Sequence, residues 1–314
     1  MQPIIEKVSR EAILAELNKD RYVRKTNNGN NEIYIITNHD SPNVMREIGR
    51  LREVTFRHAG GGTGKEIDID EYDLSSHPYK QLLVWNPEDK EIVGAYRYIA
   101  CKDAEFIDGK VHLATTELFD FSPKFYTDFL PYTIELGRSF IQPMYQPSEQ
   151  FRKGLFSLDN LWDGLGAIVI DNPNIQYYYG KVTMYTDFNV EARDYILAFL
   201  KYYFPDDKNL VKPIHAVETK TDVTEFLSSI KGLPFKEGHS VLNKRVRALG
   251  ENIPPLMNAY MNLSSTMRVF GTAINPTFGG VEETGILVRI SDIYESKKER
   301  HINSYLIEKG WLKP

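Results

Sequence analysis

The segment Thr133-Ile-Glu-Leu-Gly-Arg-Ser-Phe-Ile141 is rich in β-branched and large apolar residues, and Pro143 follows it closely. This composition predicts a β-strand that ends before Pro143. Glu135 and Arg138 lie inside the strand, where an unpaired buried charge would be costly, so each needs a partner or a wet cleft. Strand alternation puts the two on opposite faces unless Gly137 marks a bulge, which would bring them nearer a common site.

The segments on either side predict an α/β (α+β) protein with a mixed sheet. A β-hairpin is expected at 80–85 and 91–99 around a Pro-Glu-Asp turn, and its second strand carries Arg97 among apolar neighbours. Hydrophobic spacing and β-propensity assign the rest. The expected helices cover 1–20, 44–56, 155–170, 190–204 and a short segment near 223–230, and the further strands cover 32–37, 176–185, 268–273 and 285–289. We expect a single elaborated domain over 1–314, with the polar segment 205–241 as an insertion in it.

The composition is that of an ordinary globular protein. Of 314 residues, 42% are apolar, and 38 basic against 43 acidic residues give a net charge of −5, which excludes dominant disorder and argues against broad nucleic-acid binding. The single cysteine, Cys101, cannot form an internal disulfide and suits a reducing compartment. Charged residues interrupt the first 17 positions, and no apolar run approaches the roughly 20 residues of a membrane span. We therefore expect a cytoplasmic protein.

Several common catalytic motifs are absent. The sequence has no Gly-x-Gly-x-x-Gly or Walker motif, no His-x-x-x-His or Cys-x-x-Cys pattern, and no Gly-x-Ser-x-Gly elbow. We therefore expect no bound nucleotide cofactor, no metal and no covalent intermediate. The remaining candidates are the charged residues inside apolar strands. A purely structural network of ion pairs is the alternative explanation, and it would join Arg52, Asp70, Asp73 and Arg97.

Four motifs follow one another along the chain: Leu51-Arg-Glu-Val-Thr-Phe56, Asp68-Ile-Asp-Glu-Tyr-Asp73, Ala95-Tyr-Arg-Tyr98 and Glu135-Leu-Gly-Arg-Ser-Phe140. This series resembles that of the acyl-homoserine-lactone synthases and of their relatives, the N-acyltransferases of ornithine-lipid and glycine-lipid synthesis, some of which are labelled hemolysin-like. The resemblance is close over residues 45–185. It implies the GNAT acyltransferase fold, a mixed and mostly antiparallel sheet flanked by helices.

One position departs from the synthases. They carry a tryptophan six residues after the phenylalanine that matches Phe56, whereas this chain has Gly62 inside a glycine-rich loop. The departure weakens the case for S-adenosylmethionine as the amine donor and favours the lipid-forming branch. Two alternatives stay open: a lactone-forming signal synthase, and a catalytically silent module that binds acyl carrier protein or lipid.

The resemblance implies an N-acyltransferase that moves a fatty, 3-hydroxyacyl group to the α-amine of glycine or ornithine and yields a lyso-aminolipid. Glu135 would accept the ammonium proton, directly or through water, with pairing to Arg138 as the structural alternative. The arginines would bind the acceptor carboxylate or neutralise the aspartates. The implied catalytic residues are Glu135, Arg138 and Arg97, and the implied acceptor-binding residues are Arg52, Phe56, Asp70 and Asp73.

The implied acyl donor is a phosphopantetheine thioester on acyl carrier protein, or acyl-CoA, and no cofactor is expected to stay bound. Backbone N–H groups near Ser139, Phe140 and Ile141 would polarise the thioester carbonyl. The donor-binding residues expected beyond this strand are Arg152, Lys153 and Gly154 at the start of the 155–170 helix, where a phosphate would bind, and Trp162 along the acyl chain. The expected partners are acyl carrier protein and a small amino acid, with no nucleic acid. Peripheral contact with the inner face of the membrane is left open.

Overall fold

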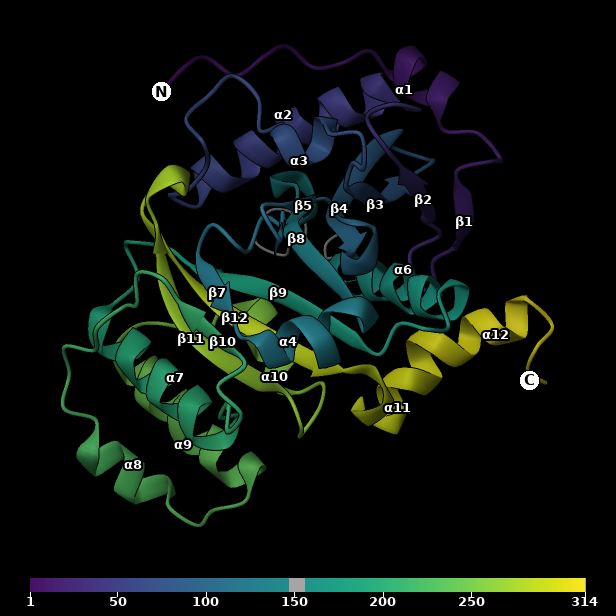
Figure 1. The fold of residues 1–314 in the computed structure, drawn as a ribbon. Coiled ribbons are helices and arrows are strands. Elements are labelled where there is room, and N and C mark those ends of the chain that lie inside the picture. The colour runs from purple at the N-terminus through teal and green to yellow at the C-terminus, as the bar shows by residue number, and fades with distance from the viewer. Residues whose placement is uncertain (147–155, 314) are drawn as a thin grey trace. The chain divides into compact units, whose positions relative to one another are not determined.

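The computed structural model describes residues 1–146 and 156–313. The chain forms two compact units, one made of residues 1–114, 132–176 and 294–314, the other of residues 115–131 and 177–293. Figure 1 traces both along the chain. Every candidate site residue named above that the structure describes belongs to the first unit.

The first unit is built on a five-stranded antiparallel arrangement in the order β1-β2-β3-β4-β8. The predicted hairpin is confirmed as β3 and β4, and the predicted strand at 133–141 is confirmed as β8 with the same bounds. The strands are β1 (Tyr22–Lys25), β2 (Glu32–Ile36), β3 (Lys80–Asn86), β4 (Glu91–Ala100) and β8 (Thr133–Ile141), with the small hairpin β5 (Phe106–Ile107) and β6 (Lys110–Val111) beside them.

Two long helices cover opposite faces of these strands (Figure 1). Helix α2 (Pro42–His58) brings Arg52 to Gln81 of β3, whereas α6 (Ser157–Asp171) packs Gly164 against Leu82, where an added Cβ would lie 2.6 Å from Leu82 Cδ1. Gln81 and Leu82 are adjacent in β3 and therefore point to opposite faces of the strands, so α2 and α6 lie on opposite sides of them. The other helices of this unit are α1 (Arg10–Glu16), α3 (Glu71–Leu74), α11 (Glu295–Lys298) and α12 (Ser304–Glu308), the last two joined by a π-helical turn over Glu299–Asn303.

The helix predicted over residues 1–20 is wrong in extent. Only Arg10–Glu16 is helical, because Ser9 caps the helix by accepting a hydrogen bond from the Ala12 amide at 3.2 Å. The preceding residues are extended instead. The amide of Gln2 donates to the carbonyl of Gly64 at 2.8 Å, so the start of the chain lies along the glycine-rich loop.

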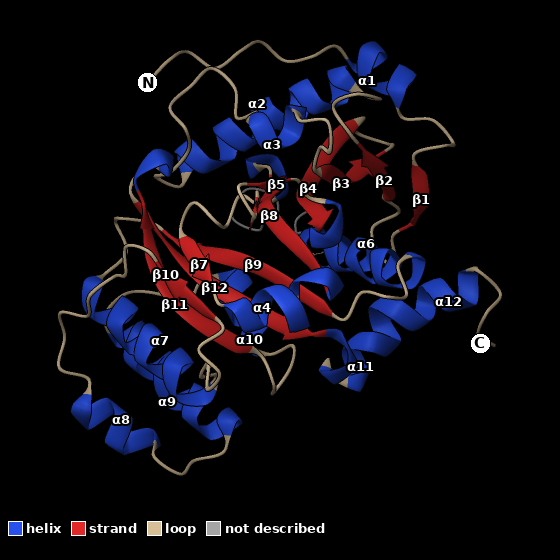
Figure 2. Cartoon of the chain, viewed as in Figure 1, coloured by secondary structure: helices blue, strands red, loops and turns tan. Residues whose placement is uncertain are grey.

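The second unit combines a three-stranded antiparallel arrangement, β9-β12-β11, with the strand pair β10-β7 and a set of helices (Figure 2). Its aromatic core includes Phe125, Tyr179 and Phe270, whose ring centroids lie 5.6 to 6.3 Å apart. The elements are β7 (Phe119–Phe121), α4 (Pro123–Asp128), β9 (Tyr177–Met184), α7 (Val190–Tyr203), β10 (Val211–Pro213), α8 (Thr224–Ile230), α9 (Phe235–Ala248), α10 (Pro255–Met261), β11 (Arg268–Asn275) and β12 (Val281–Arg289).

The segment 205–241 is more regular than the sequence suggests. Its predicted short helix is confirmed as α8, but α9 begins inside the segment at Phe235. The buried face of α9 is made by Gly238, Leu242 and Val246, which are spaced four residues apart. Polar residues between them conceal that period in the sequence. Within the ranges 1–146 and 156–313, no helix has the length and apolar character needed to cross a membrane.

Candidate functional site

Helix α2 contributes a completely buried charge to the site. The Arg52 side chain is completely buried, and its Nη1 lies 2.8 Å from Oδ2 of Asp73, which is also completely buried. Nη2 donates to Oε1 of Gln81 at 2.6 Å, and Nε2 of Gln81 donates to Asp73 at 2.9 Å. Because each group has charged or polar partners, this pair meets the condition under which buried ions persist.

The two aspartates of the second motif hold each other in place. Asp70 is the N-cap of α3 and accepts from the Asp73 amide at 3.3 Å, while the Asp73 carboxylate accepts from the Asp70 amide at 3.3 Å. This is a capping box, which the Asp-x-x-Asp spacing encodes. A one-turn helix therefore fixes both carboxylates, with Asp73 turned towards Arg52 and Asp70 towards β4.

Arg97 of β4 connects the aspartates to two aromatic rings. Its Nη1 donates to both oxygens of Asp70, at 2.8 and 2.7 Å, and its guanidinium lies 5.5 Å from the Tyr72 ring centre and 5.1 Å from that of Tyr79. Burial alone would raise the pKa of Asp70, but the charges of Arg97 and Arg138 outweigh burial and hold this pKa well below its usual range. Burial disfavours the cation at Arg97, yet Asp70 and Asp73 raise its pKa, so it stays charged.

A β-bulge turns Arg138 towards the same cluster. In the β4–β8 pairing Arg97 is opposite Gly137 and Ala95 is opposite Phe140, so Arg138 and Ser139 together face one residue of β4. Arg138 has φ +48°, a left-handed conformation that is uncommon outside glycine. Its Nε lies 2.9 Å from Asp68, and Nη2 lies 3.7 Å from Asp70. The bulge considered from the sequence is thus present, centred on Arg138 rather than on Gly137.

Glu135 lies on β8 and is almost completely buried, with 1% of its surface exposed. The hydroxyl of Tyr79 donates a hydrogen bond to its Oε2. Arg138, the partner considered for Glu135 in the structural alternative, forms ion pairs with Asp68 and Asp70. Tyr79 and Gln81 were not identified as site residues from the sequence. A polar residue at an inward position of β3 was the available signal for Gln81.

Two aromatic residues among the predicted set lie side by side. Phe56 of α2 and Phe140 of β8 are buried, with ring centroids 6.4 Å apart at an interplanar angle of 76°. Ser139 and Ile141 flank Phe140 at the end of the bulged strand. The other three donor residues predicted from sequence position, Arg152, Lys153 and Gly154, lie outside the described residues, and Trp162 is a half-buried residue of α6.

The glycine-rich loop is folded around a buried glutamate. Glu53 of α2 accepts from the amide of Gly64 at 2.7 Å and from the side chain of Arg57 at 2.6 Å. Gly62 has φ +90°, and an added Cβ would lie 3.1 Å from Cγ of Arg57 and 3.2 Å from Oε1 of Glu53. The position therefore suits glycine in both conformation and space, and a tryptophan at Gly62 would require this loop to rearrange.

The arrangement is suited to holding a small ligand that carries one positively charged and one negatively charged group. The described cluster contains three guanidinium groups, of Arg52, Arg97 and Arg138, and four carboxylates, of Asp68, Asp70, Asp73 and Glu135. Asp70 (27% of the side chain exposed) and Arg138 (13%) form its accessible edge. A ligand there would meet a carboxylate and a guanidinium together. Cys101 is buried, and burial raises the pKa of its thiol, which disfavours a nucleophilic thiolate.

Comparison with known proteins gives a consistent result. Residues 51–153 match the model of the acetyltransferase (GNAT) domain, which confirms the predicted fold. The chain is 53% identical over 307 residues to a glycine N(alpha)-acyltransferase of Phocaeicola vulgatus, covering 98% of this chain and 94% of that protein. It is 54% identical over 307 residues to a glycine N(alpha)-acyltransferase of Bacteroides thetaiotaomicron, covering 98% and 91%.

Among solved structures, the chain is similar to a CoA-dependent acyl-homoserine lactone synthase, BjaI, determined with S-adenosylmethionine and isopentyl-CoA. The two are 12% identical, the match covers 88% of this chain and 89% of that one, and the TM-score is 0.38.

Proposed function

Because this chain belongs to the family of the glycine N(alpha)-acyltransferases and is an N-acyltransferase, we propose that it transfers a fatty, 3-hydroxyacyl group from acyl carrier protein to the α-amine of glycine. The product would be an N-acylglycine, a lyso-aminolipid. The observation that carries the proposal is the buried cluster of guanidinium and carboxylate groups, whose accessible edge pairs Asp70 with Arg138.

The charges of the cluster support an amino-acid acceptor. Asp70 keeps its negative charge because the nearby guanidinium groups lower its pKa, so it can hold an ammonium group but is a weak base. Arg138 offers a guanidinium to the acceptor carboxylate from the same edge. The cluster has one more carboxylate than guanidinium groups, which favours binding of a cationic amine. The names of the two relatives favour glycine over ornithine.

We assign the proton transfer to Glu135. The acceptor ammonium loses one proton to this carboxylate, directly or through a water molecule. The amine nitrogen then forms a C–N bond with the thioester carbonyl carbon, the C–S bond breaks, and the sulfur leaves as a thiol with the second amine proton. Backbone N–H groups near Ser139, Phe140 and Ile141 polarise the carbonyl. Ser139 lies in the bulge, which takes its backbone out of the regular pairing with β4.

For the donor, we propose a phosphopantetheine thioester on acyl carrier protein, with acyl-CoA as the alternative. Arg152 and Lys153 give the chain a basic segment before α6, which complements an acidic carrier surface. The paired rings of Phe56 and Phe140 provide apolar surface for the acyl chain beside the charged cluster. We place the enzyme in the cytoplasm, where the free thiol of Cys101 stays reduced.

Lactone synthesis from S-adenosylmethionine is the less favoured function. In the synthases that this sequence resembles, the position of Gly62 is occupied by tryptophan. Here an added Cβ at Gly62 would already lie 3.1 Å from Cγ of Arg57 and 3.2 Å from Oε1 of Glu53, and the φ of +90° disfavours any residue with a side chain. Incubation with S-adenosylmethionine and acyl thioester should therefore yield no homoserine lactone.

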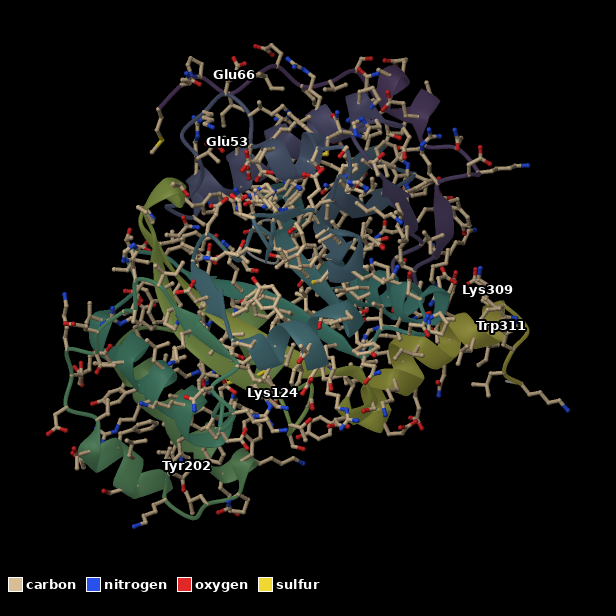
Figure 3. All side chains as sticks on the ribbon, viewed as in Figure 1. Glu53, Glu66, Lys124, Tyr202, Lys309 and Trp311 are labelled. Carbon is tan, nitrogen blue, oxygen red and sulfur yellow. The ribbon has the colours of Figure 1, made fainter. Side chains whose placement is uncertain are left out.

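We also propose that the enzyme contacts the membrane peripherally, because the proposed product is amphiphilic. At the end of α12, Ile307, Trp311 and Leu312 are 37%, 66% and 41% exposed, and the exposed lysines Lys309 and Lys313 flank them. Figure 3 shows Lys309 and Trp311 at the outer end of this helix. Aromatic and aliphatic side chains bordered by lysines suit the interface of an anionic membrane.

The proposed function is tested with the purified chain, acylated carrier protein and glycine, with products identified by mass spectrometry. We expect N-acylglycine from the natural chain and from Glu88→Gln, which makes the same change at the exposed β3–β4 turn. Glu135→Gln should lower the rate by about 10²–10⁴-fold, as expected for loss of a general base. No N-acylglycine from the natural chain with either carrier-protein or CoA thioesters would refute the function. Acylation of ornithine in place of glycine would refute the acceptor.

A further inference from the structure

Tyr79 lies at the base of the charged cluster and is not one of the residues that the resemblance supplies. It immediately precedes β3 and is 2% exposed. Its amide donates to the carbonyl of Tyr72 at 2.8 Å, and the two rings pack edge to face with centroids 5.7 Å apart. The guanidinium of Arg97 lies over the Tyr79 ring. The ring is therefore fixed on several sides.

The hydroxyl of Tyr79 has one donor and one acceptor contact, and their directions are fixed by chemistry. The backbone amide of Ala114 lies 3.1 Å from the phenol oxygen, and an amide N–H can only donate. The phenol has a single proton, which it gives to Oε2 of Glu135. The hydroxyl is thus oriented as a donor to this carboxylate by a backbone group.

From this geometry we infer that Tyr79 is a positioning residue for the proton acceptor: its hydroxyl orients the Glu135 carboxylate and stabilises the ionised form that accepts the ammonium proton. This inference rests on the proposed function, in which Glu135 is the base. A hydrogen bond donated to a carboxylate favours its ionised form, which opposes the effect of burial on β8. The hydroxyl also stays a donor, since burial and the neighbouring charge of Glu135 raise the pKa of Tyr79 well above its usual value.

The register of three strands explains how the hydroxyl comes to this carboxylate. Lys80 pairs with Tyr98 across β3 and β4, so Tyr79 lies next to Ile99 along the same ladder. Ile99 pairs with Glu135 across β4 and β8. Directly paired residues point to the same face of a sheet, so Tyr79 and Glu135 share a face with one residue between them. A shift of either strand by one residue would separate the two side chains.

The charged and titratable groups around this pair include Arg97 of β4, Asp70 at the N-cap of α3 and Cys101 after β4. Arg97 and Cys101 have raised pKa values, and Asp70 has a lowered one, so none of them changes charge near neutral pH. His112 packs on Tyr72, with ring centroids 4.8 Å apart. His112→Gln, which changes this neighbouring side chain, therefore serves as a separate control.

The test is the pH profile of kcat/KM for glycine. Tyr79→Phe keeps the ring and its contact with Arg97 but removes the hydroxyl. We expect kcat to fall about tenfold and the acidic limb of the profile to move upward by about one pH unit, because the carboxylate loses a charged hydrogen bond. Tyr98→Phe, on the opposite face of β4, removes a buried hydroxyl that does not reach Glu135 and should leave the limb in place.

A double variant keeps the inference falsifiable if Tyr79→Phe is less stable. When Tyr79 acts through Glu135, Tyr79→Phe combined with Glu135→Gln should be no slower than Glu135→Gln alone, whereas independent roles would multiply the two losses. An unmoved acidic limb, or multiplied losses, would overturn the inference while leaving N-acyltransferase activity intact. A natural chain that makes no N-acylglycine would instead overturn the proposed function. If the acidic limb moves in His112→Gln but not in Tyr79→Phe, the limb reports the histidine rather than Glu135, and the inference is overturned.

Discussion

Nη1 of Arg52 lies 2.8 Å from Oδ2 of Asp73, and neither side chain is exposed to solvent. Removing the charge of either residue leaves the charge of the other buried without its ionic partner. We expect Asp73→Asn to lower the free energy of unfolding by about 3–5 kcal/mol, measured by urea denaturation. Replacing both with apolar residues, Arg52→Met with Asp73→Leu, should cost less than the single change, because no charge is then left unpaired.

The exposed pair Lys124–Asp128 supplies the control, since Asp128→Asn breaks an ion pair of similar length on the surface. That variant should unfold at nearly the same urea concentration as the natural chain. If Asp73→Asn behaved in the same way, Arg52 would have to be stabilised by Gln81 and the Asp68 carbonyl alone.

The left-handed backbone of Arg138 gives a second prediction. This conformation costs an L-residue roughly 1–2 kcal/mol, and glycine adopts it without that cost. Arg138→Gly and Arg138→Ala both lose the contact with Asp68, but only alanine retains the strain. We expect Arg138→Gly to be more stable than Arg138→Ala by about 1 kcal/mol in urea denaturation, with both variants losing activity towards glycine. Equal stability of the two would show that the bulge relaxes when the arginine is removed.

The lowered pKa of Asp70 predicts how stability depends on pH. A carboxyl whose pKa is lower in the folded state than in the unfolded state contributes stability above its unfolded pKa of about 4. That contribution is lost as the pH falls from this value through the folded pKa. The difference in unfolding free energy between the natural chain and Asp70→Asn should therefore be constant from pH 5 to 8 and shrink below about pH 4. A difference that stays constant to pH 2 would contradict the assigned direction.

Much of this site could be predicted because its charges lie within short segments. Asp70 and Asp73 are three residues apart and form a capping box, and Glu135 and Arg138 are charged residues within a single apolar strand, β8. The bulge could be proposed but not located, since Gly137 and Arg138 both allow it and only the pairing with β4 decides. Tyr79 could not be predicted, because its contact with Glu135 depends on the register of three strands that lie far apart in the sequence.

The helices of the second unit were harder to predict for a related reason. Helix α9 is stabilised by the contact of its buried residues with α7, and an added Cβ at Gly238 would overlap the hydroxyl of Tyr203. That glycine lowers the intrinsic helix propensity of the segment while permitting the close packing that holds the helix in place. Tertiary contacts therefore outweigh local preference here, and a single sequence does not display them.

The exposed end of α12 gives the last prediction. Gly310 has φ +74° and ends the helix, and the Trp311 amide donates to the Leu306 carbonyl at 2.9 Å, which fixes the turn that presents the indole. The chain has three tryptophans, and Trp85 is buried. We expect vesicles of phosphatidylglycerol and brominated phosphatidylcholine to quench the fluorescence of the natural chain, and Trp311→Phe to remove most of that quenching. Lys309→Ala with Lys313→Ala should weaken binding by about 1 kcal/mol per lysine, an effect that added salt abolishes. Lys124→Ala in the second unit should bind as the natural chain does. Quenching that survives Trp311→Phe would place the membrane contact elsewhere on the protein.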